Sequence, residues 1–142
     1  MTALGLLGPL HAIAAGLGLA LLTTAVFRLH RAGSSQPVGR LATISGLLMG
    51  LPFALGCAIY PAYRLEIKPG LLIDHAGLAR AFESKEHLAA MGLFCVLGGV
   101  GALLGPSGRR AGTSLLTIGW LLCASAATIG VVVTWWPTVS GP

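Results

Sequence analysis

Charged side chains are scarce in this sequence, and their scarcity excludes most soluble folds. Only 9% of the 142 residues are Asp, Glu, Lys or Arg, whereas soluble domains carry roughly 25%. The mean hydropathy is +0.85. A chain of this composition could not cover its surface with polar groups in water. The composition therefore predicts an integral membrane protein.

Several motifs of known functional sites are also absent from the sequence, which excludes some classes of function. The chain has 3 cysteines and no CxxC spacing, which favours neither a disulfide framework nor a zinc site. We find no phosphate-binding loop, no dinucleotide-binding fingerprint and no Ser-His-Asp arrangement. The net charge is +5, but the basic residues lie in short connections and form no stripe or tail. We therefore expect no nucleic-acid binding.

Four apolar runs are long enough to cross a bilayer: residues 9–27, 41–60, 87–104 and 114–136. A hydrocarbon core of about 30 Å needs about 20 helical residues. Proline fits the first turn of a helix, whereas a proline further along the helix tends to kink or end it. Pro9 is therefore expected to begin the first helix, and Pro61 and Pro137 to end the second and the fourth. The predicted fold is an all-α bundle of four transmembrane helices in a single domain, 1–142.

The charges predict an orientation. The connections after the first and third runs hold arginines and no acid, which is typical of cytoplasmic loops. All four acids lie in the connection 61–86. We expect this connection and both termini on the outer side, which is the periplasmic side of a bacterial inner membrane. Asp74 is expected to cap a short amphipathic helix that starts at His75 and bends or runs directly into the third span.

Two histidines are expected at a similar depth near the outer side. His11 lies near the start of the first span, and His87 lies at the mouth of the third. Imidazoles from two helices are the usual axial ligands of a b-type haem. The sequence therefore predicts one haem near the outer leaflet, held by His11 and His87. The arrangement resembles small four-helix membrane cytochromes b, which implies electron transfer between a quinol or another membrane partner and an outer-face carrier.

The surrounding polar side chains suit such a haem. The cations would neutralise its propionates, the tyrosines would donate hydrogen bonds, and a glutamate would fix the tautomer of a ligating histidine. These side chains are Tyr60, Tyr63, Arg64, Lys68, Glu83 and Glu86.

Two alternatives remain open. The chain could be a non-catalytic accessory subunit of a larger respiratory or photosynthetic membrane complex, with its outer charges docking a partner. It could also handle copper, because His87, Met91 and Cys95 are spaced by four on one helix. Their imidazole, thioether and thiolate groups suit Cu(I). An electron carrier or a subunit fits the sequence better than a stand-alone enzyme.

Overall fold

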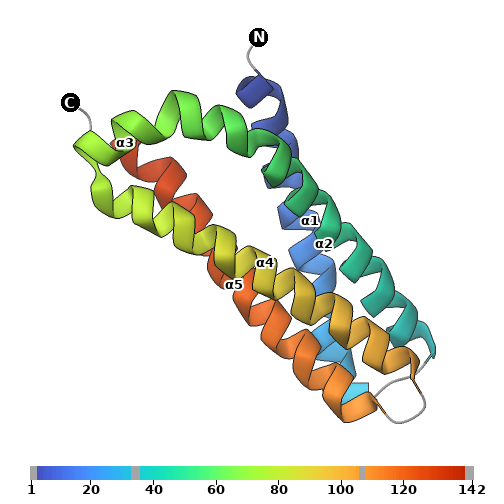
Figure 1. The fold of residues 1–142 in the computed structure, drawn as a ribbon. Coiled ribbons are helices and arrows are strands. Elements are labelled where there is room, and N and C mark those ends of the chain that lie inside the picture. The colour runs from blue at the N-terminus through green and yellow to red at the C-terminus, as the bar shows by residue number, and fades with distance from the viewer. Residues whose placement is uncertain (1–2, 33–35, 106–107, 140–142) are drawn as a thin grey trace.

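Four long helices form the bundle (Figure 1). The computed structural model describes residues 3–32, 36–105 and 108–139. The long helices are α1 (Ala3–Ala32), α2 (Gln36–Ala62), α4 (Ala76–Leu104) and α5 (Arg109–Val139). Each is long and apolar enough to cross a membrane. The predicted all-α membrane bundle is thereby confirmed.

The connection between α2 and α4 is helical as well. It consists of a π-helical turn, η1 (Tyr63–Ile67), and a short helix, α3 (Lys68–Asp74). These elements carry the chain over one end of the bundle, where α1 also starts and α5 ends (Figure 1). We call this end, with all four acids, the polar end. The opposite end, where α1 ends and α5 begins, is the basic end.

The predicted amphipathic helix at the polar end is the first part of α4, which runs directly into the span. The capping prediction for Asp74 was wrong. Asp74 is the last residue of α3, and His75 occupies the N-cap position of α4 without a side-chain capping bond. The α3–α4 junction instead uses main-chain bonds, from the His75 amide to the Leu71 carbonyl at 2.8 Å and from the Leu78 amide to the His75 carbonyl at 2.9 Å.

Proline did not set the helix ends as predicted. Pro9 and Pro61 lie inside α1 and α2, and Pro137 lies within the bounds of α5. α2 ends at Ala62, one residue after Pro61, and α5 ends at Val139, two residues after Pro137. α1 starts at Ala3, so Pro9 lies in its second turn. The apolar runs therefore predicted the spans, and the helices extend beyond them.

The helices pack in a square. α1 packs on α2 and α5, and α4 packs on α5 and α2. Consequently α1 and α4 lie on one diagonal of the bundle.

The closest approach in the bundle is between α4 and α5, where glycines of one helix meet the backbone of the other. A Cβ on Gly99 would lie 2.9 Å from the amide nitrogen of Leu116 and 3.0 Å from the Gly112 carbonyl oxygen. A Cβ on Gly119 would lie 2.9 Å from the Gly92 carbonyl oxygen. In lipid, such small residues let backbones approach and gain dispersion contacts. We call this contact the glycine seam (Gly92, Gly99, Gly112, Gly119).

Gly46 and Gly50, which are four residues apart on α2, have different contacts. A Cβ on Gly46 would lie 3.1 Å from Val100 and 3.4 Å from Val96, so Gly46 lets α2 approach α4. A Cβ on Gly50 would meet nothing within 4 Å. Only one glycine of the pair is therefore needed for the fold of this chain.

Hydrogen bonds join α1 to α5. The Trp120 indole donates to the Thr23 hydroxyl at 2.8 Å, and the Thr23 hydroxyl donates to the Leu19 carbonyl at 2.7 Å. Nearer the basic end, His30 Nε2 and Thr117 Oγ1 are 3.0 Å apart. Polar groups in an apolar medium must find such partners, so these bonds fix the register of the two helices.

The outside of the bundle is apolar. Phe94 and Leu104 are each 74% exposed, Leu47 is 69% exposed and Leu17 is 62% exposed. Exposed apolar surface on this scale would associate in water, whereas in a bilayer it contacts acyl chains. With the four spans, it indicates an integral membrane protein.

The glycine seam yields a test of the packing. Gly99→Ala should lower the free energy of unfolding by about 1–3 kcal/mol, because overpacking a tight contact forces the backbones apart. Gly101→Ala is the matched control on the same helix, since a Cβ there would meet nothing within 4 Å. Unfolding is followed by circular dichroism as SDS replaces a mild detergent. Equal stability of the two variants would refute the close contact.

Candidate functional site

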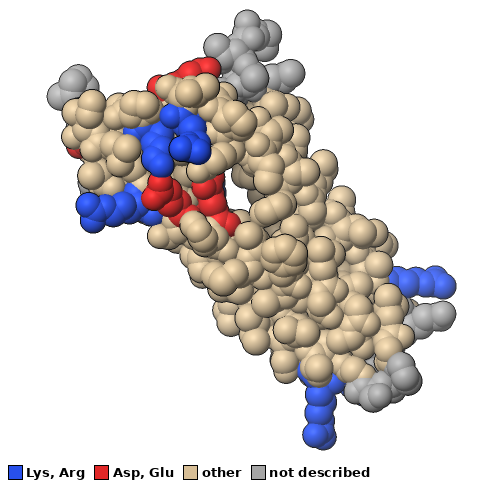
Figure 2. All heavy atoms as spheres, in the orientation of Figure 1, with Lys and Arg blue, Asp and Glu red and all other residues tan. Residues whose placement is uncertain are grey.

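The polar end combines charged and aromatic side chains from α1, α2, η1, α3 and α4. Figure 2 shows a hollow there, with acidic side chains on its border and basic side chains beside them. No other part of the chain holds both signs of charge, because every acid lies in 61–86. The candidate site is therefore built at this end.

His11 is held between α1 and α2. Its Nδ1 lies 2.8 Å from the carbonyl oxygen of Pro52, and a carbonyl can only accept. Nδ1 therefore carries the proton and donates, which leaves Nε2 with a free lone pair. The half-buried ring also packs on Gly56, where a Cβ would lie 3.3 Å from Cε1 of His11. The orientation of this imidazole is consequently fixed on two sides.

His87 has the same tautomer in a different setting. Its Nδ1 lies 2.8 Å from the Glu83 carbonyl oxygen, one turn back on α4, so Nδ1 donates and Nε2 keeps its lone pair. The side chain is exposed, in line with exposed Met91 and Phe94 on the same helix. The two histidines thus come from helices on a diagonal, and the structure does not turn them toward each other: His11 packs on α2, and His87 lies on an exposed face of α4.

The predicted cations have different surroundings. Lys68 of α3 forms a salt bridge with the Glu83 carboxylate of α4, which ties the connection to the span. Glu83 also lies within electrostatic range of Arg64 and His87. Arg64 is exposed on η1. Of the two cations, Lys68 is therefore already neutralised by the protein.

The predicted tyrosines form an aromatic stack with Phe82. The ring centroids of Tyr63 and Phe82 are 3.9 Å apart at an interplanar angle of 19°, and those of Tyr60 and Tyr63 are 6.3 Å apart. Tyr63 is 5% exposed, and its hydroxyl has no hydrogen-bond partner among the described residues. The π-helical turn begins at Tyr63, and such turns occur frequently at functional sites. The sequence has no signal for this turn.

Lys85 belongs to the site, although the sequence does not single it out. Its ammonium lies 4.3 Å from the centroid of the Phe82 ring, a cation–π contact. Its aliphatic chain runs toward α5, within 3.5 Å of where a Cβ of Gly130 would lie. The ammonium is also within electrostatic range of Glu86 and His11. The three-residue spacing could have suggested the contact between Lys85 and Phe82. The approach of Lys85 to Gly130 is shown only by the packing of α4 on α5.

Glu86 is half-buried and close to both kinds of charge. It lies within electrostatic range of Lys85, Glu83, Lys68 and His87. The carboxylates of the site are thus balanced by neighbouring cations, as expected for charges near the membrane.

The described residues contain no group of three or more His, Cys, Asp or Glu side chains that could hold a metal ion. Along the predicted copper stripe, His87 and Met91 are exposed and Cys95 is half-buried. Copper handling therefore stays a prediction from spacing.

The chain was also compared with known proteins. No family model matches it, and no curated protein or solved structure matches it either. The functional argument therefore rests on the residues of the polar end.

The unpartnered hydroxyl of Tyr63 yields a test. A buried polar group without a hydrogen bond costs about 1–3 kcal/mol. Tyr63→Phe should therefore raise the free energy of unfolding by roughly 1 kcal/mol, measured in the SDS titration described above. Tyr60→Phe is the control, because Tyr60 is only half-buried, and it should change little. A destabilised Tyr63→Phe would mean that the hydroxyl is bonded in the membrane.

Proposed function

We propose that the protein is a membrane electron carrier with one b-type haem at the polar end, which His11 and His87 would hold through their Nε2 atoms. The observation that carries the proposal is the shared tautomer of the two imidazoles. Each donates Nδ1–H to a main-chain carbonyl and keeps the Nε2 lone pair free. Metal-ligating histidines typically have this arrangement, because the donated hydrogen bond orients the ring and raises its basicity.

The two ligands would contribute unequally. His11 is oriented by Pro52 and Gly56, so it is the better fixed of the two. His87 lies on an exposed face of α4 and is not turned toward His11, so its side chain would have to reorient to bind the same iron. Both imidazoles thus have the free nitrogen that a haem ligand needs. His11 is the better placed of the two, because its ring is held in a fixed orientation.

A bound haem would supply reversible one-electron chemistry. The residues of the chain would bind and orient it. Arg64 is the cation that remains for a propionate, because Lys68 is paired with Glu83. The buried Tyr63 hydroxyl is a donor without a partner among the described residues. A quinol or another membrane partner would deliver electrons, and an acceptor at the polar end would take them.

The proposal is tested by the visible spectrum of the full chain purified in mild detergent. We expect a Soret band and, on reduction, an α band. His11→Ala should lower the haem content by at least about tenfold, because even the hydrogen-bond partners of metal ligands contribute roughly 10–100-fold to affinity. His87→Ala should also lower the haem content and leave the remaining haem five-coordinate.

His75→Ala is the matched control, since His75 lies at the same end and is exposed. It should keep the full spectrum. Colourless wild-type protein would refute the proposal, and so would full haem content in His87→Ala.

The second candidate is a non-catalytic subunit of a larger membrane complex. It is favoured by glycines of α4 that the fold does not use: Gly98 and Gly101 are exposed, and a Cβ on Gly101 would meet nothing within 4 Å. In membranes, exposed small residues suit a neighbouring helix. Colourless protein that co-purifies in a fixed ratio with a larger assembly would support this candidate.

A further inference from the structure

A second polar feature lies at the basic end, far from the candidate haem site. A pocket of about 360 Å³ lies between the end of α1 and the start of α5. Its lining residues are Leu29, His30, Arg109, Arg110, Thr113 and Ser114. It therefore combines two guanidinium groups, an imidazole and two hydroxyls.

The positive charge of this pocket is not balanced by the protein. Arg109 and Arg110 are exposed, and the four acids of the chain all lie in 61–86 at the other end. On the face shown in Figure 2, basic side chains project from the basic end without acidic ones beside them. A ligand for the pocket should consequently be an anion.

The hydrogen bonds show how the pocket wall is held. The Thr117 hydroxyl donates to the Thr113 carbonyl at 2.8 Å, so its oxygen accepts from His30 Nε2 at 3.0 Å. This bond fixes the ring of His30 on α5 and leaves Nδ1 for another partner. The Thr113 hydroxyl donates to the Arg109 carbonyl at 2.9 Å. These bonds hold His30 and Thr113 in place, and the exposed side chains of Arg109 and Arg110 lie beside them.

Apolar surface continues from the pocket along α5. Ile118 follows Ser114 by one turn and is 48% exposed, and Leu121 is 52% exposed. Leu29 contributes an apolar side chain to the lining itself. A ligand with an anionic head and an apolar tail matches both parts, whereas a soluble anion matches only the first.

We propose that this pocket binds the phosphate of an anionic phospholipid, with the acyl chains along α5. Arginine pairs with phosphate through two parallel hydrogen bonds, and basic pockets between membrane helices bind anionic headgroups in this way. The inference does not depend on haem binding.

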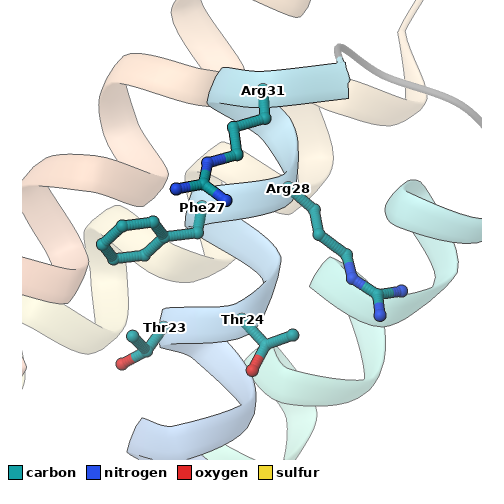
Figure 3. A pocket seen from close by; sticks show the side chains of 5 residues that line it. All are labelled: Thr23, Thr24, Phe27, Arg28 and Arg31. Carbon is teal, nitrogen blue, oxygen red and sulfur yellow. The ribbon is translucent and has the colours of Figure 1, made fainter.

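A second basic pocket nearby is lined by one helix instead of two. It measures about 330 Å³ and is lined by Thr23, Thr24, Phe27, Arg28 and Arg31. Figure 3 shows that all five side chains come from α1. This second pocket does not lie between two helices, so it lacks the two-sided lining of the first. Arg28 can therefore serve as a control position.

The experiment measures lipid retention by native mass spectrometry of the full chain, with phosphatidylglycerol, phosphatidylcholine or inorganic phosphate added to the detergent. We expect phosphatidylglycerol to bind at least about tenfold more tightly than phosphatidylcholine. Both lipids carry a phosphate, but only phosphatidylcholine also brings a quaternary ammonium, which the two guanidinium groups would repel. Arg109→Gln/Arg110→Gln should abolish this preference. The control is Arg28→Gln/Arg40→Gln, in which Arg28 lies in α1 and Arg40 lies near the start of α2. It removes the same charge at the same end and should keep the preference.

One further variant separates the charge of the two arginines from their hydrogen-bond geometry. Arg109→Lys/Arg110→Lys retains the charge and should bind with intermediate affinity, because lysine cannot form the paired hydrogen bonds. Equal binding of the two lipids would overturn the proposal. Displacement of phosphatidylglycerol by millimolar inorganic phosphate would show a site for free anions, which also overturns it. The haem spectrum of Arg109→Gln/Arg110→Gln should match the wild type, so the two proposals fail independently.

Discussion

The bundle depends on the contact of two backbones in the glycine seam between α4 and α5. A single methyl group on Gly99 or Gly119 would lie 2.9 Å from a backbone atom of the other helix. In lipid there is no hydrophobic force between helices, so such close dispersion contacts must supply much of the association. Other contacts join α1 and α2 to this pair: Gly46 lets α2 reach Val96 and Val100, and the Trp120 indole donates to the Thr23 hydroxyl of α1.

The seam also sets the geometry of the polar end. α4 packs against α5, and Phe82 and Glu83 of α4 lie within contact distance of residues in η1 and α3. Tyr63 stacks on Phe82, and Lys68 pairs with Glu83. Lys85 reaches across toward Gly130. Glu83 is thereby paired with Lys68, and the Lys85 ammonium lies over the Phe82 ring.

The expectations from the sequence succeeded where composition alone decides. Runs of about 20 apolar residues predict spans, because the bilayer thickness sets the length. They were less accurate for the exact positions at which the helices begin and end. α2 runs only one residue past Pro61 and α5 only two residues past Pro137, whereas α1 begins six residues before Pro9. The π-helical turn after Pro61 and the burial of Tyr63 had no signal in the sequence.

The sequence by itself therefore determined the four spans, the separation of acids from most arginines, and the presence of His11 and His87 near one end. Only the tertiary structure decided which side of each helix faces its neighbours. It put His11 against Pro52 and Gly56 and left His87 exposed. The physical reason is that these helices are apolar on nearly every side. Burial from water cannot select a face there, and the fit of small side chains between backbones selects it instead.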